Sequence, residues 1–171
     1  SVVRAAMVPV AHPATVLHGP NSAVVVEAAN AGRLMFLGPG AGGSPTASAV
    51  TGDLVTVARN RIRGVGGPAH SVYQALATAP MGQTRTRYYL RFKVVDQSGV
   101  LAAVAGLLAR HHVSVHSVRQ TPTVNGDTPA TARVSMMTHV AQESAATDCV
   151  ADLEHSDFVI GSVPLIRAEV A

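Results

Sequence analysis

The sequence predicts an α+β protein in two parts, and three observations lead to this prediction. Residues 85–171 alternate strand-like and helix-like segments in the order βαββαβ. Residues 62–84 hold four Gly and two Pro without a sustained period, which is typical of a linker. Before them, short apolar segments lead into one helical pattern. We therefore expect a first segment at 1–61, a linker at 62–84 and a second domain at 85–171.

The first segment is predicted to be mixed α/β structure. Its apolar stretches end at Gly or Pro turn signals and have the length of strands. The expected strands are 3–8, 22–28 and 33–37. A helix is expected at 45–61, with Ser44 as its N-cap and Pro45 at its first position, because apolar residues recur there near helical spacing.

The second domain is predicted to be a ferredoxin-like βαββαβ sandwich, with four antiparallel strands and two helices on one face. Its expected elements are a strand at 86–95, a helix at 98–111, a strand at 113–120, a turn through Pro122, Asn125-Gly126 and Pro129, a strand at 131–139, a helix at 142–155 and a strand at 157–168. The opposite face or an edge strand is then able to pair with another copy, so we expect a homo-oligomer, a dimer formed through strand pairing.

Composition narrows the class of protein. Apolar residues make up 47% of the 171 residues and charged residues 13%, against a typical charged share of about 25%. A chain of this composition is expected to fold and to bury part of its surface against another domain or protein. Its apolar runs are far shorter than the roughly 20 residues that span a bilayer, so no membrane partner is expected. The one cysteine, Cys149, agrees with the reducing cytoplasm.

The net charge of +3 does not indicate a nucleic-acid partner. Residues 1–84 carry five Arg against Glu27 and Asp53, and these hold the positive excess. Three of those Arg, at 59, 61 and 63, close the predicted helix, where cations interact favourably with the helix dipole. We therefore expect the chain not to bind nucleic acid.

A glycine loop, GPGAGG at 38–43, lies between a predicted strand and the predicted helix. Its G-x-G-x-x-G pattern lacks the dinucleotide-binding context, because no second strand follows the helix and no acidic residue stands about 20 positions on. Ser44 also occupies the position of the Walker A lysine. Two interpretations remain: a helix N-terminus that receives an anion, or a tight turn that needs Gly for its backbone conformation.

Residues 38–55, GPGAGGSPTASAVTGDLV, resemble the signature segment of homoserine dehydrogenase, and residues 1–37 resemble the stretch that leads into it. The resemblance implies that Gly38, Gly40 and Gly42 form a cofactor-side loop, with Gly42 touching the nicotinamide cofactor, NAD(P). Thr46 and Ser48 are weaker candidates that can equally be helix caps. The family's Rossmann domain and catalytic lysine have no counterpart here, since Lys93 is the only lysine and lies in the second domain.

Residues 89–120 resemble an ACT domain, the ligand-binding module that follows the catalytic part in longer homoserine dehydrogenases. The resemblance implies an amino-acid effector, with threonine expected first. Residues proposed to contact the effector are Asp96, Ser98, Gly99 and Gln120. Ser98 is expected to cap the helix that begins there. In the alternative interpretation, Asp96 only caps the helix, Gly99 only eases the turn, and Gln120 and Ser117 are solvated strand residues.

Other reactive side chains are not expected to form a site. His111 and His112 are adjacent on a helix end and point about 100° apart, and no second cluster near His116 supplies further ligands, so no metal is expected. Cys149 lacks a neighbouring base and is expected in the core. We assign no catalytic residue to the chain.

The function implied by these resemblances is that of the C-terminal portion of a homoserine dehydrogenase, which interconverts L-homoserine and L-aspartate 4-semialdehyde with NAD(P). The chain alone is expected to be inactive and to bind no cofactor. The alternative is a freestanding ACT-domain amino-acid sensor, or a dimerisation module without catalysis.

Overall fold

The computed structural model describes residues 5–67, 77–123 and 130–169 and divides the chain into two compact units. One unit joins Ser1–Val10 to Thr78–Ala171, and the other is Ala11–Ala77. The expected second domain corresponds to most of the first unit. The first ten residues differ from expectation, since they belong with this unit and not with the 1–61 segment.

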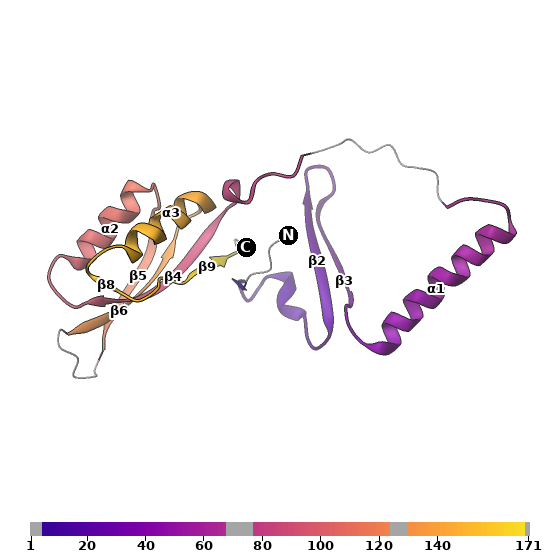
Figure 1. The fold of residues 1–171 in the computed structure, drawn as a ribbon, viewed down its shortest axis with the longest axis horizontal. Helices are drawn as coiled ribbons and strands as arrows, with labels where there is room; N and C mark the ends of the chain where they lie inside the picture. The colour runs from indigo at the N-terminus through magenta and orange to yellow at the C-terminus, as the bar shows by residue number, and fades with distance from the viewer. Residues whose placement is uncertain (1–4, 68–76, 124–129, 170–171) are drawn as a thin grey trace. The chain divides into compact units, whose positions relative to one another are not determined.

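A sheet forms the centre of the unit that holds residues 78–171 (Figure 1). Its principal strands, in spatial order, are β1 (Ala6–Met7), β9 (Leu165–Ala168), β4 (Arg85–Val95), β6 (Thr131–Thr138) and β5 (Val115–Pro122). Two short strands, β7 (Ala141–Gln142) and β8 (Val159–Ile160), also pair with β4. Apart from the parallel pair of β1 and β9, the pairs are antiparallel.

Helices α2 (Val100–Arg110) and α3 (Glu143–Glu154) lie on one face of this sheet (Figure 1). Side chains of a strand alternate between its two faces. The buried side chains of β4 are those on the helix face. They are Thr86, Tyr88, Leu90, Phe92 and Val94. Together with the order β9-β4-β6-β5, this arrangement confirms the predicted ferredoxin-like βαββαβ module.

The predicted strand at 157–168 is wrong as a single element. The chain forms β8, bends, and then forms β9. Gly161 has a φ of 82°, which an extended strand does not allow, and Pro164 next to β9 has no N–H to donate. Between them the backbone N–H of Val163 donates to Oε1 of Glu154, at 2.8 Å. This side-chain contact satisfies a donor that a continuous strand would have used in the sheet.

The predicted strand at 3–8 is shorter than expected, because only β1 at Ala6–Met7 is formed and residues 1–4 lie outside the described residues. The parallel pairing of β1 with β9 explains why the first ten residues pack with the second domain. In the predicted turn through Pro122, Asn125-Gly126 and Pro129, Pro122 ends β5, and the other three residues lie outside the described residues.

The other unit contains a hairpin and a helix. Strands β2 (Asn21–Ala28) and β3 (Gly32–Pro39) are antiparallel, and α1 (Gly43–Ile62) follows (Figure 1). These elements confirm the predicted strands at 22–28 and 33–37 and the predicted helix at 45–61. No residue of the described part of this unit is buried. Short 3-10 turns occur at Pro13–Val16 here and at Met81–Gln83 before β4.

Candidate effector site and glycine loop

The loop between β4 and α2 is held by its backbone. The N–H of Asp96 donates to the carbonyl of Ala130 at 2.8 Å, and the N–H of Gln97 donates to Val95 at 3.1 Å. The N-cap of α2 is Gly99, with a left-handed φ of 90° and no side-chain cap. The prediction that Ser98 caps this helix is therefore wrong, because Gly99 takes the backbone conformation that precedes the first helical residue.

Asp96 and Gln120 come together although 24 positions separate them. Nε2 of Gln120 donates to Oδ1 of Asp96 at 3.1 Å, and both side chains are exposed. Gln120 pairs with Val134, which is buried under the helices, so Gln120 lies on the helix face of β5. Ser117 pairs with Met137 and lies on the opposite face, away from Gln120. No side chain caps α2, so Asp96 does not act as its cap; its carboxylate contacts Gln120 of β5.

The start of α2, a few residues after Asp96 in the chain, supplies hydrogen-bond donors. The first N–H groups of an α-helix have no acceptor within the helix. Within the described part of the chain, the N–H groups of Ser98, Leu101 and Ala102 donate no hydrogen bond. A carboxylate and unpaired N–H groups match the two charged ends of an amino acid: the carboxylate accepts from the ammonium, and the N–H groups donate to the ligand's carboxylate.

Two glycines of the 38–43 loop have structural reasons to be Gly. Gly40 donates its N–H to the carbonyl of Pro20 at 2.9 Å, and a Cβ on Gly40 would lie 2.8 Å from the Cβ of Ser22. Gly42 has a φ of 124°, which residues with side chains rarely adopt. Gly38 differs, because a Cβ there would meet nothing within 4 Å of it. These contacts show a tight turn and leave open space at Gly38.

The start of α1 corrects a second predicted cap. The N-cap is Gly42 and not Ser44, so Pro45 is the third helical residue. Proline is tolerated there because the N–H groups of the first turn have no helical acceptor. Thr46 donates both its N–H, at 3.2 Å, and its hydroxyl, at 2.7 Å, to the carbonyl of Gly42. Its hydroxyl is therefore engaged within the helix, whereas Ser48 is an exposed residue of α1.

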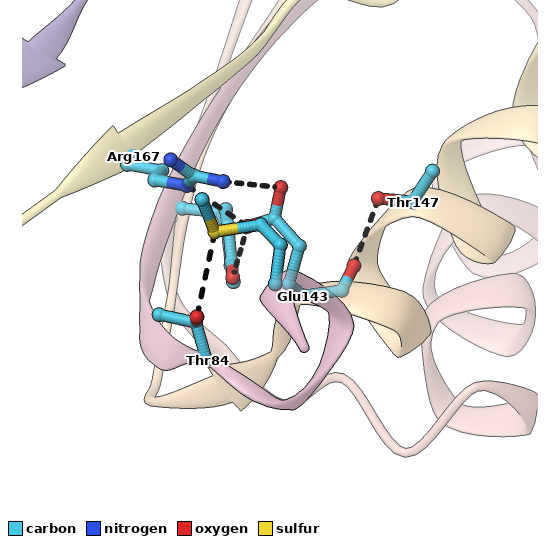
Figure 2. A network of polar contacts seen from close by, with 6 residues as sticks. Thr84, Glu143, Thr147 and Arg167 are labelled. Carbon is cyan, nitrogen blue, oxygen red and sulfur yellow. Dashed lines mark hydrogen bonds and ion pairs between the residues drawn. The ribbon is translucent and has the colours of Figure 1, made fainter. Parts of the chain in front are cut away.

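A buried polar network was not found by sequence reasoning. Glu143 opens α3, and its carboxylate accepts two hydrogen bonds from Arg167 of β9, at 2.8 and 2.9 Å (Figure 2). It also accepts one from the hydroxyl of Tyr88 of β4, at 2.8 Å. The backbone N–H of Glu143 donates to the carbonyl of Thr84, and its carbonyl accepts from the Thr147 hydroxyl. One carboxylate thus ties two strands to a helix.

The electrostatics of this network favour a charged pair. Glu143 is 5% exposed, so its ionised form depends on these partners. Burial and the hydrogen bond to Glu143 raise the pKa of Tyr88 well above its ordinary range, so its hydroxyl remains a donor. The hydrogen bond to Glu143 raises the pKa of Arg167 further. These shifts support a structural role, since Tyr88 stays protonated and Arg167 stays charged at neutral pH.

The remaining reactive side chains occupy separate places. Cys149 is buried, as predicted, and burial raises the pKa of its thiol to about 11, which leaves it protonated and unreactive at neutral pH. His111 contacts Asp152 at 2.8 Å, while the rings of His116 and His139 lie 5.1 Å apart. Among the described residues, no three His, Cys, Asp or Glu side chains converge as metal ligands would.

Comparison with known proteins agrees with both sequence resemblances. The family model described as ACT domain matches residues 88–148, and that described as homoserine dehydrogenase matches residues 1–55. Homoserine dehydrogenase from Mycobacterium tuberculosis is 49% identical over 168 residues, which are 98% of this chain and 38% of the relative. The Corynebacterium glutamicum enzyme is 40% identical over 97% of this chain and 35% of its own length.

Solved structures give the same result. A homoserine dehydrogenase from Thiobacillus denitrificans superposes with a TM-score of 0.76 at 31% identity, over 96% of this chain and 37% of that structure. The Staphylococcus aureus enzyme at pH 7.0, at 21% identity and a TM-score of 0.53, shares the fold. The chain thus spans less than two fifths of the length of these relatives.

The fold of the C-terminal unit and the family match at residues 88–148 identify it as an ACT module. The chain as a whole corresponds to the C-terminal portion of homoserine dehydrogenase, as its sequence predicted. Among the described residues, no helix is both long and apolar enough to cross a membrane.

Proposed function

We propose that this chain serves as the cofactor-side loop and regulatory module of a cytoplasmic NAD(P)-dependent homoserine dehydrogenase. The observation that carries the proposal is the presence of both family matches, in order, in one chain that aligns over 98% of its length with 38% of a relative. None of the described residues of 11–67 is buried, and this supports the proposal. A helix and hairpin without buried residues need further protein to cover them.

Regulation is proposed to occur at the loop after β4. There Asp96 accepts the ammonium of a small amino acid, threonine first, and the N–H groups at the start of α2 receive its carboxylate, with Ser98 and Gly99 forming the turn. Gln120 holds the Asp96 carboxylate in place through its 3.1 Å hydrogen bond. Charged hydrogen bonds contribute about 1.5–3 kcal/mol each, and two or three of them must also offset the freedom that the ligand loses, at least about 4 kcal/mol. Because the remaining free energy of binding is small, we expect a dissociation constant between about 10 μM and 1 mM.

Calorimetry on the 171-residue chain tests this site. Threonine and then other small amino acids are titrated into the wild-type chain, Asp96→Ala and the control Asp148→Ala, which removes an exposed carboxylate from α3. Asp96→Ala should weaken binding about tenfold or more, the effect of one lost charged hydrogen bond, while Asp148→Ala should not. Absence of heat with every amino acid, or equal binding by Asp96→Ala, would remove the effector site.

The cofactor, which supplies hydride transfer when bound, is proposed to approach Gly38, Gly40 and Gly42. Gly40 and Gly42 are poor positions for a test, because a side chain there disturbs the loop itself. In Gly38→Ala the added Cβ meets no atom within 4 Å, so the loop itself should not be disturbed. A lower affinity of the complete enzyme for NADP would therefore mean that the added methyl group obstructs the cofactor. Gly52→Ala, also in open space but within α1, is the matched control. Unchanged affinity in Gly38→Ala would leave the loop a structural turn.

A freestanding sensor or dimerisation module remains the second candidate. It is favoured by the location of the core: among the described residues, the buried apolar side chains all lie in residues 78–171. Strand β5 at the sheet edge has exposed side chains along nearly its whole length and is the strand we propose for pairing with a second copy. Light scattering that gives a dimer, together with calorimetry that gives no heat, would favour this candidate.

A further inference from the structure

The face of the central sheet opposite α2 and α3 (Figure 1) is positively charged. The strands of this sheet, as the structure describes them, contain no Asp or Glu. Strand residues alternate between the two faces, so the residues between the buried ones of β4 and β6 lie on the face away from the helices. The cations on that face include Arg87, Arg91 and Lys93 of β4, Arg119 of β5 and Arg133 of β6.

Three of these arginines surround one serine. Ser135 of β6 pairs with Arg91 of β4 on one side and with Arg119 of β5 on the other. Because neighbouring strands lie about 4.8 Å apart, the Cα atoms of these two arginines are roughly 10 Å apart, with Ser135 between them. Arg133, two positions before Ser135 on the same strand and face, lies about 6.7 Å from it. We call these four residues the arginine cluster.

Described residues do not neutralise the charges of the arginine cluster. Its three arginines are exposed, and none of their side chains makes a hydrogen bond or ion pair with another residue that the structure describes. The hydroxyl of the half-buried Ser135 has no such contact either. Like charges on neighbouring strand positions repel each other. A bound anion would remove this repulsion and use the free donors.

We propose that the arginine cluster binds an anion with two linked phosphate groups, a diphosphate. Guanidinium groups donate in pairs to phosphate oxygens, and three of them match the charge of a diphosphate better than that of a single phosphate. The Ser135 hydroxyl at the centre supplies a further donor. A diphosphate occurs free or within a nucleotide. Tyr89, half-buried two positions before Arg91 and paired with Met137, offers an apolar surface for the base of a nucleotide.

Other occupants match this face less well. A second copy would bring the same positive charges against it, so packing of two such faces is disfavoured. Pairing of two copies edge to edge through β5 would leave the face open. Proteins bind single-stranded nucleic acid by stacking successive bases on aromatic rings. On this face of the described strands, Tyr89 is the only Phe, Tyr or Trp.

The arginine cluster is distinct from the two sites proposed above. Gln120, the partner of Asp96, lies on the helix face of β5, whereas its neighbour Arg119 lies on the other face. The glycine loop at 38–43 belongs to the other unit of the chain. The diphosphate site therefore does not depend on the effector or on the cofactor, and each proposal can fail alone.

Titration of pyrophosphate into the 171-residue chain tests the cluster, with binding followed by calorimetry and by the backbone N–H resonances. We expect saturable binding of pyrophosphate, about tenfold weaker binding of inorganic phosphate, and resonance shifts centred on the four cluster residues. Added salt should weaken the binding, because it screens charges. ADP distinguishes the two sources of the diphosphate. Tighter binding of ADP than of pyrophosphate, with shifts that extend to Tyr89, indicates a nucleotide, and equal binding indicates the free anion.

Variants locate the site. Arg119→Gln and Arg133→Gln should each weaken pyrophosphate binding about tenfold, the effect of a lost charged hydrogen bond. Arg110→Gln is the matched control, because it removes the same charge from an exposed position of α2 in the same unit. It should weaken binding by less than about twofold, since a distant charge is screened. If a cluster variant does not fold, the location of the shifts in the wild-type chain decides.

Three results would overturn the proposal. The first is that pyrophosphate does not bind saturably, or that its shifts lie away from the arginine cluster. The second is that Arg110→Gln weakens binding as much as Arg119→Gln does, which would mean that only the net charge of the chain attracts the anion. The third is that adenosine or a short single-stranded RNA binds more tightly than pyrophosphate.

Discussion

At the scale of single residues, the carboxylate of Glu143 connects three elements of the ACT module. It is buried, it accepts three hydrogen bonds from Arg167 and Tyr88, and it joins α3 to β4 and β9. Replacing one member of such a buried pair leaves the other charge without a partner, and this costs far more than an exposed pair would contribute.

Glu143→Ala should therefore lower the free energy of unfolding of this unit by about 3 kcal/mol, because Arg167 would lose its buried partner. Urea unfolding followed by the near-ultraviolet circular dichroism of tyrosine measures the change. Asp148→Ala, at an exposed position of the same helix, should change it by less than about 0.5 kcal/mol. Equal effects of the two substitutions would show that the network is not stabilising.

Sequence reasoning did not identify this network for a physical reason. Glu143 at a helix start has the appearance of an ordinary first-turn acid, which favours the helix dipole without being buried. Its partners lie 24 and 55 positions away, and only the folded sheet brings them together. Asp96 and Gln120 were predicted as site residues by resemblance, and their direct hydrogen bond appears only when β5 lies beside the loop.

Whole elements were predicted well where hydrophobic periodicity determines them. The alternation in β4 and the apolar face of α2, with Val104 and Leu108 buried, follow directly from the sequence. The two predicted serine caps are wrong because Gly42 and Gly99 adopt backbone conformations that favour glycine and begin the helices themselves. A serine near a helix start therefore predicts the N-cap poorly where a neighbouring glycine can take that position.

Helices α2 and α3 are joined by an exposed contact that depends on pH. Nε2 of His111, at the end of α2, lies 2.8 Å from Oδ2 of Asp152 of α3. The hydrogen bond with His111, helped by the charge of Arg110, lowers the pKa of Asp152 below its ordinary value. A lowered carboxyl pKa stabilises the fold at pH values above the unfolded pKa, and this contribution is lost as the pH falls through the folded pKa.

The carboxyl carbon resonance of Asp152 should therefore titrate below the ordinary aspartate midpoint. His111→Ala should move that midpoint upward, because it removes the largest cause of the shift. His112→Ala, at the neighbouring position, is the control and should leave it in place. A midpoint that does not respond to His111→Ala would show that the hydrogen bond is absent in solution.

At the scale of the whole molecule, the two units differ in how much surface they bury. The ACT module has a core of its own, whereas the described residues of 11–67 have none. Exposed apolar side chains there include Phe36 at 63% and Leu54 at 64% exposure. The low charged fraction of the sequence predicted that part of this surface would be covered by another surface. In our account it is the remainder of a homoserine dehydrogenase.

The native polypeptide that contains this sequence tests that account most directly. Captured through an antibody against residues 85–171, it should have a mass corresponding to about 440 residues, since 168 aligned residues make up 38% of a relative. The captured fraction should reduce NAD(P) in the presence of homoserine, and the purified 171-residue chain should not. A native polypeptide of only 171 residues, or homoserine oxidation by that chain alone, would contradict the account.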